Sequence, residues 1–148
     1  MEFRKEDQFS EEIELLVRNV IGAAIEVHRE LGPGYLEKIY EQAMLIELNH
    51  RGIACATQVV IPVYFKGKQL HGHVLDMLVE GKVILELKSV ESLLPIHTAQ
   101  ILSYLKSTGL RVGLLINFNK RLLKDGIKRL VRKNDYSCTL NQPFPLGL

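Results

Sequence analysis

The sequence has no tryptophan, only two cysteines and no long uninterrupted run of apolar residues. Cys55 and Cys138 lack CxxC spacing and are too few for a disulfide framework or a cysteine-based zinc site, so the reducing cytoplasm is the expected compartment. A membrane-spanning helix needs about 20 consecutive apolar residues, and a signal peptide needs an apolar stretch where this N-terminus is charged. We therefore expect neither membrane insertion nor export.

The composition that remains is typical of a globular domain. The 148 residues are 47% hydrophobic and 24% charged, without repeats or low-complexity segments. We expect one domain over residues 1–148, in which 132–148 form a tail without clear periodicity. The net charge of +2 is unevenly distributed, because residues 120–133 carry seven basic side chains against Asp125 alone. This basic segment could contact phosphate groups.

Hydrophobic periodicity predicts two helices followed by strands. The first helix covers residues 11–30, with Ser10 as its cap, and the second ends near Arg51. Strand patterns follow over 57–65, 71–79 and 83–90, then a third helix from Pro95 to Gly109 and a buried strand over 112–118. The segment 122–131 fits two alternatives, a hairpin turn at Asp125-Gly126 or a basic helix.

Two carboxylates and a lysine lie within strands that otherwise consist of core residues. If residues 80–82 form a three-residue loop, residue 79 pairs with 83, and Asp76 lies opposite Glu86 with the Cβ atoms about 5 Å apart. Lys88 shares the face of Glu86, since alternate strand residues point the same way. Two like charges at this distance destabilise a sheet unless one acid is protonated or a cation lies between them, and Mg²⁺ prefers such oxygen ligands. The pattern indicates metal-assisted phosphodiester hydrolysis, and a plain ion pair of Lys88 with either acid is the alternative.

Two further groups of polar residues lie on predicted helices. Glu37 and Tyr40 follow Gly34 at the start of the second helix, where acids also favour the helix dipole and Tyr40 also fits a core stripe. Gln100 and Tyr104 are one turn apart on the third helix, where they could contact phosphate or a base, or serve as partly buried polar partners.

Taken together, Gly34-x-x-Glu37-x-x-Tyr40, Asp76, Glu86-x-Lys88 and Gln100-x-x-x-Tyr104 resemble the GxxExxY protein family of the PD-(D/E)XK nuclease superfamily. The resemblance extends from about residue 20 to 131. It implies an α/β (α+β) restriction-endonuclease-like core, with a mixed sheet of four to five strands flanked by helices, in the order αβββαβ after an extra N-terminal helix. Leu75 stands where the superfamily name has proline.

The resemblance also implies roles for these residues. Asp76, Glu86 and the Leu87 carbonyl would bind the metal, Glu37 would bind it directly or through water, and Lys88 would activate the attacking water. Gln100, Tyr104 and Tyr40 would position the substrate. The expected function is Mg²⁺- or Mn²⁺-dependent hydrolysis of phosphodiester bonds in nucleic acid, with DNA as the first candidate substrate. The protein could form a homodimer. The alternative is a non-catalytic module that binds nucleic acid or protein on the same scaffold.

Overall fold

The structure is a computed structural model that describes residues 10–133. The elements in chain order are α1 (Glu11–Leu31), α2 (Glu37–His50), β1 (Cys55–Phe65), β2 (Lys68–Val79), β3 (Val83–Lys88), α3 (Pro95–Thr108), β4 (Val112–Asn117), the short 3₁₀ helix η2 (Leu123–Gly126) and β5 (Ile127–Val131). This order confirms the expected mixed α+β fold. The predicted tail lies outside the described residues beyond position 133.

The ends of the helices follow local sequence signals. The Ser10 hydroxyl accepts a hydrogen bond from the Ile13 N–H at 3.3 Å and so caps α1. Gly32, with φ of 69°, ends that helix, and its N–H donates to the His28 carbonyl at 2.7 Å. Pro95 opens α3, and Gly109 closes it in the left-handed conformation. These ends confirm the predicted helices.

The described strands form one mixed sheet in the order β1-β2-β3-β4-β5, in which β3 and β4 are parallel and the other neighbours are antiparallel. Lys66 and Gly67 join β1 to β2 with φ of 49° and 74°, as a two-residue hairpin turn of type I′ requires. The next connection spans residues 80–82, so that Val79 pairs with Val83 and Leu78 with Ile84. This is the predicted register.

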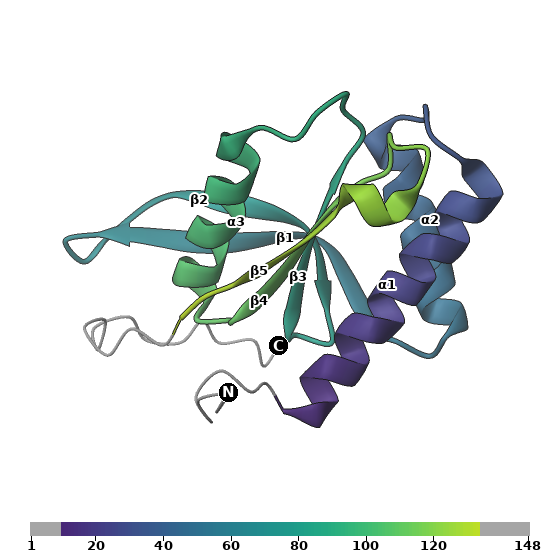
Figure 1. Cartoon of the computed structure of the whole chain (residues 1–148). Helices are drawn as coiled ribbons and strands as arrows, with labels where there is room; N and C mark the ends of the chain where they lie inside the picture. The colour runs from purple at the N-terminus through teal and green to yellow at the C-terminus, as the bar shows by residue number, and fades with distance from the viewer. Residues whose placement is uncertain (1–9, 134–148) are drawn as a thin grey trace, which may run out of the picture.

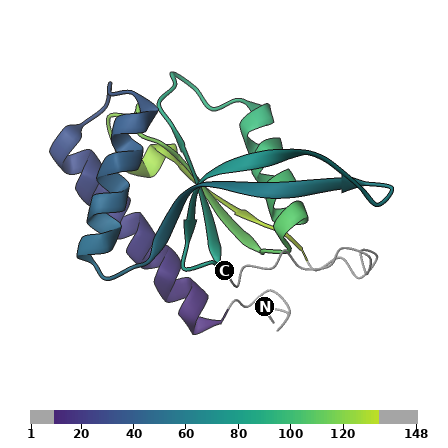
Figure 2. The same cartoon turned by 180° about the vertical axis from the view of Figure 1, so that it is seen from behind.

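Helices cover both faces of the sheet. Figure 1 and Figure 2 show α1 and α2 on one face and α3 on the other. The α1/α2 side has the larger apolar core, which includes Val20, Met44, Leu85 and Phe118, all fully buried. The α3 side has a second core around Ile61, Ile84 and Ile101. Both faces of β3 and β4 are therefore buried, which accounts for their nearly continuous apolar sequences.

The segment 122–131 forms neither a basic helix nor a simple hairpin turn. Residues 123–126 make a single 3₁₀ turn, and 127–131 form the edge strand β5, antiparallel to β4. Gly126 allows this turn, because a Cβ at that position would lie 2.2 Å from the Asn117 carbonyl oxygen. The hairpin alternative is thus closer to the structure than the helix.

Candidate active site

The carboxylates of Asp76 and Glu86 meet where β2 and β3 separate. The ladder between these strands ends at the pair Met77 and Leu85. Beyond it, the Asp76 N–H donates to Glu86 Oε1 at 3.0 Å, and the Leu87 N–H donates to Asp76 Oδ2 at 2.9 Å. Each carboxylate thus replaces a ladder hydrogen bond by binding the backbone of the opposite strand. The predicted juxtaposition of the two acids is present.

The Leu87 backbone completes this edge. The N–H and carbonyl of one strand residue point to the same side of the strand. Since the Leu87 N–H donates to Asp76, the Leu87 carbonyl also points toward β2, where the ladder has ended. Two carboxylates and a carbonyl therefore line the gap between the strands.

Burial and mutual repulsion disfavour two negative charges at this position. Glu86 is only 5% exposed, and its burial, together with the charge of Asp76, raises its pKa to about 8. The pKa of Asp76 is also raised, mainly by burial, and the Leu87 N–H and the charge of Lys88 counteract this effect. The pair therefore retains a proton near neutral pH unless a cation takes its place.

Lys88 is half-buried at the end of β3, on the same side as Glu86 by strand alternation. Its charge lowers the pKa of both acids. The ion pairs found within residues 10–133 do not join Lys88 to Asp76 or Glu86. The simple ion-pair alternative is therefore not the arrangement in this structure.

A pocket of about 700 Å³ opens beside Asp76 and extends to the start of α2. Its lining includes Glu37, Glu41, Gln58, Asp76, Ser89 and Asn119. Glu37 is exposed at its rim, whereas Glu41, one turn further on, is only 8% exposed and accepts a hydrogen bond from Gln58 Nε2 at 2.9 Å. The charge of Glu41 raises the pKa of Asp76 more than that of Glu37 does. Glu41 thus lines the candidate site, although the sequence pattern, which places it one turn from Glu37 on the same helix face, gave it no role there.

Within the described part of the chain, no three or more His, Cys, Asp or Glu side chains gather closely enough to hold a metal ion. Glu37 lies exposed at the pocket rim, and its contact with an ion, direct or through water, stays a prediction.

Tyr40 has a different role from the expected contact with substrate. Its side chain is fully buried, and its ring stacks on that of Phe118 with 4.4 Å between centroids. The hydroxyl donates to the Gly32 carbonyl at 2.6 Å and accepts from the Tyr35 N–H at 3.2 Å. Tyr40 thus belongs to the core stripe of α2 and anchors the loop before Glu37, since burial prevents contact with a substrate.

Gln100 and Tyr104 lie one turn apart on α3 but differ in exposure. Gln100 is exposed, whereas Tyr104 is 9% exposed, with its ring 4.7 Å from that of His73 on β2. Burial raises the pKa of Tyr104, and the charges of Glu86 and Asp76 raise it further. His73 is half-buried and packs against α3 through this contact.

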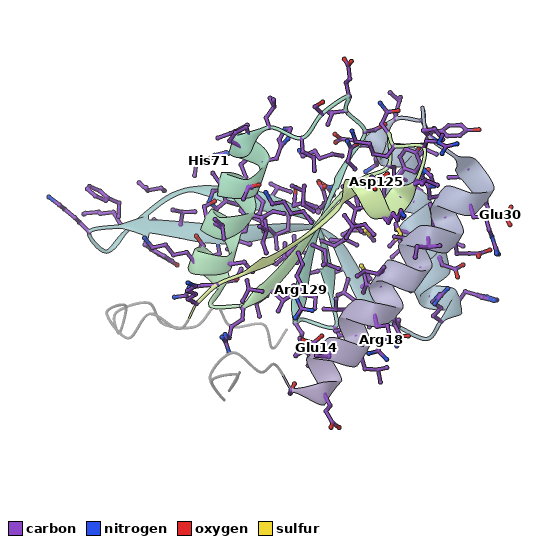
Figure 3. All side chains as sticks on the ribbon, viewed as in Figure 1. Glu14, Arg18, Glu30, His71, Asp125 and Arg129 are labelled. Atoms are coloured by element: carbon purple, nitrogen blue, oxygen red, sulfur yellow. The ribbon has the colours of Figure 1, made fainter. Side chains whose placement is uncertain are left out.

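One side chain of the basic segment 120–133, Arg129, pairs with an acid of the protein itself. Figure 3 shows Asp125 at η2 and Arg129 further along β5, beside Glu14 at the start of α1. Arg129 donates two hydrogen bonds to the Glu14 carboxylate, at 2.7 and 3.1 Å, and thereby lowers the pKa of Glu14. Arg129 thus stabilises the packing of α1 on the sheet. The basic composition of the segment did not predict this role.

Asn117 supports the loop that follows β3. It is fully buried at the end of β4, where its Nδ2 donates to the Val90 carbonyl at 2.8 Å. Its Oδ1 accepts from the N–H groups of Val90 and Asn119, at 3.1 and 3.2 Å. A buried asparagine that satisfies three backbone groups holds this chain segment beside Lys88, with which Asn117 pairs across the strands.

Comparison with known proteins agrees with the fold. The model of a family described as PD-(D/E)XK nuclease superfamily matches residues 14–130, which is most of the chain. No curated protein and no solved structure matches the chain. Among the helices that the structure describes, none is long and apolar enough to cross a membrane.

Proposed function

The chain belongs to the PD-(D/E)XK nuclease superfamily, and we propose that it is a divalent-metal-dependent nuclease of the GxxExxY type that hydrolyses phosphodiester bonds in DNA. The observation that carries the proposal is the buried pair of Asp76 and Glu86 at the point where β2 and β3 separate, with Lys88 beside it. Burying two acids that repel each other costs free energy of folding, and a bound ligand can offset this cost. Such a pair is therefore typical of a functional site.

The donor set of this edge fits a hard divalent cation. Asp76, Glu86 and the Leu87 carbonyl offer only oxygen atoms, as Mg²⁺ and Mn²⁺ prefer, and the remaining positions suit water and phosphate. Glu37 would contact such an ion through water from the pocket rim, and Glu41 adds a second negative charge nearby. When bound, the cation stabilises negative charge on the scissile phosphate.

The other site residues act directly on substrate and water. Lys88 would orient the attacking water by hydrogen bonding and offset the charge that develops on the phosphate as the new P–O bond forms. Gln100, exposed on α3, can donate to a phosphate oxygen. Tyr104 is mostly buried and packs against His73 on β2, so it would position this part of α3 rather than contact the nucleic-acid backbone extensively.

Cleavage of a labelled panel of single-stranded, duplex and branched DNA and of RNA, with Mg²⁺ or Mn²⁺, tests the proposal. Asp76→Asn, Glu86→Gln and Lys88→Ala should each reduce cleavage by at least about 100-fold. Glu91→Gln, a carboxylate exposed in the loop after β3, is the matched control and should cleave like the parent. Cleavage by any of the three site variants at the parental rate would refute the assigned roles.

Two further measurements test the non-catalytic alternative and the expected homodimer. Salt-dependent binding without divalent cation and without product would instead favour a non-catalytic nucleic-acid-binding module. The oligomeric state in solution, measured by light scattering with and without DNA, tests whether two copies pair on a duplex.

A further inference from the structure

The hairpin of β1 and β2 extends well beyond the strands that flank it. Figure 1 shows its turn projecting past α3, away from the rest of the sheet. We use "hairpin arm" for residues 59–75, from the pair Val59 and Leu75 to the turn at Lys66 and Gly67. At about 3.4 Å per residue, the six steps from Val59 to Phe65 make the arm roughly 20 Å long.

Helix α3 covers one face of the hairpin arm at its base, whereas Phe65 and Leu70 near the turn are 61% and 49% exposed. Ile61 and Leu75 are fully buried under α3, and the His73 ring contacts Tyr104 on that helix. The opposite face is bare: Val60 and Val74 pair across the strands and are 63% and 46% exposed. Apolar side chains arranged in this way on an open sheet face are typical of a contact surface.

Tyr64 extends the bare face toward the turn. Between the pairs Ile61/His73 and Val63/Leu70, β1 advances by two residues and β2 by three, so the extra residue of the bulge lies on β2. Alternation along β1 is therefore unbroken, and Val60, Pro62 and Tyr64 share a face. Tyr64 is 62% exposed.

The charge of the hairpin arm favours an anionic partner. No Asp or Glu occurs between Leu48 and Leu75, whereas Lys66 and Lys68 lie at the turn. The bare face also leads to the candidate active site, because Gln58 and Asp76, two residues from Val60 and Val74, line the pocket. A partner along this face would reach the acids directly.

We propose that the bare face of the hairpin arm binds single-stranded nucleic acid that leads into the active site. This inference rests on the proposed nuclease function and names its substrate class. A duplex presents phosphates on its outside. On the bare face these phosphates would contact two valines, a proline and a tyrosine, with no basic side chain among them to neutralise their charge. A single strand presents base faces, which can stack on Tyr64 and pack on Val60 and Val74, while its phosphates reach Lys66 and Lys68.

Binding of labelled single-stranded and duplex DNA and of single-stranded RNA, measured by fluorescence anisotropy in the non-cleaving Asp76→Asn background, tests the proposal. Tyr64→Ala should weaken single-strand binding about tenfold, and Tyr64→Phe should restore it because the ring is retained. Lys66→Gln with Lys68→Gln should reduce the slope of log affinity against log salt by about 1.4. Duplex affinity should not change in any of these variants.

Two controls match these substitutions. Lys106→Gln changes an exposed lysine at the far end of α3, and Ile46→Ala removes an apolar side chain that is 71% exposed on α2. Neither should alter binding. Because all of these side chains are exposed, thermal midpoints should also stay at the parental value, which excludes misfolding as the cause.

The outcomes separate this inference from the function on which it rests. If the background protein binds single strands but Tyr64→Ala binds them equally well, the hairpin arm is not the contact surface and the nuclease proposal is unaffected. The hairpin arm is likewise ruled out if Tyr64→Ala weakens duplex binding as much as single-strand binding. If the background protein binds no nucleic acid, both proposals fail.

Discussion

Replacing Glu86 by glutamine should change how the free energy of unfolding depends on pH. In the metal-free folded protein the pKa of Glu86 is about 8, whereas in the unfolded chain it returns to about 4.5. Between these values the folded state holds a proton that the unfolded chain has lost, so the contribution to stability is complete below pH 4.5 and disappears as the pH rises to 8.

The magnitude follows from the two pKa values. The difference between 4.5 and about 8 corresponds to at most about 5 kcal/mol, lost with a slope of about 1.4 kcal/mol per pH unit. The proton is shared with Asp76, so the slope belongs to the pair. Glutamine resembles the protonated acid and cannot ionise. Glu86→Gln should therefore match the parent near pH 5 and exceed its stability by up to about 4 kcal/mol at pH 8.

Urea unfolding in the presence of a chelator, followed by circular dichroism from pH 5 to pH 9, measures this effect. Glu91→Gln, which changes an exposed carboxylate, should follow the parent throughout. Parallel pH profiles for the parent and Glu86→Gln would refute the reasoning, because they would mean that Glu86 does not retain a proton in the folded state.

Four further outcomes follow from the structure. In a thermal melt, Mn²⁺ at about 100 times its dissociation constant should add about 2.7 kcal/mol to the stability of the parent but not to that of Glu86→Gln. Because the ion replaces a proton, its dissociation constant should fall as the pH rises. Tyr40→Phe should lose about 1–3 kcal/mol in urea unfolding, because the Gly32 carbonyl and the Tyr35 N–H lose their buried partner; an unchanged midpoint would contradict the anchoring role. Asn117→Ala should cost about 2–3 kcal/mol in the same assay and increase amide exchange at Val90, whereas protection at parental levels would speak against this support. Gly72→Ala should destabilise the protein by at least about 1 kcal/mol, since the new Cβ would lie 2.6 Å from the Ile61 carbonyl oxygen; a stable variant with an intact hairpin would show that the bulge can relax.

Much of the fold and the core of the site could be predicted because their causes are local. Ser10, Gly32, Pro95 and Gly109 mark helix ends through backbone geometry and hydrogen bonds within a few residues. The length of the loop at residues 80–82 sets the register of β2 and β3, and that register brings Asp76 to Glu86. Strand alternation placed Lys88 beside Glu86, and the family resemblance then supplied the expected roles of these residues.

The residues around this pair depended on packing between distant segments. The spacing of Glu37, Tyr40 and Glu41 places them at one end of a helix. Tyr40 stacks on Phe118, and Glu41 accepts a hydrogen bond from Gln58, so both are buried by residues from distant parts of the chain. Similarly, nothing in the segment 122–131 distinguishes a helix from a strand until the open edge of β4 offers it backbone hydrogen bonds.

Strand alternation is another local rule that the packing of the whole domain modified. Leu75 and Met77 should share a face, yet Leu75 packs in the α3 core and Met77 in the α1/α2 core, so the alternation breaks at Asp76. On the opposite strand, Gln58 has a φ of 53° at the same level. Local signals along the chain thus establish the elements from α1 to β4 and which two acids meet. Which faces are covered follows from the helices that pack there from distant parts of the chain, and this covering leaves the hairpin arm bare beside the site.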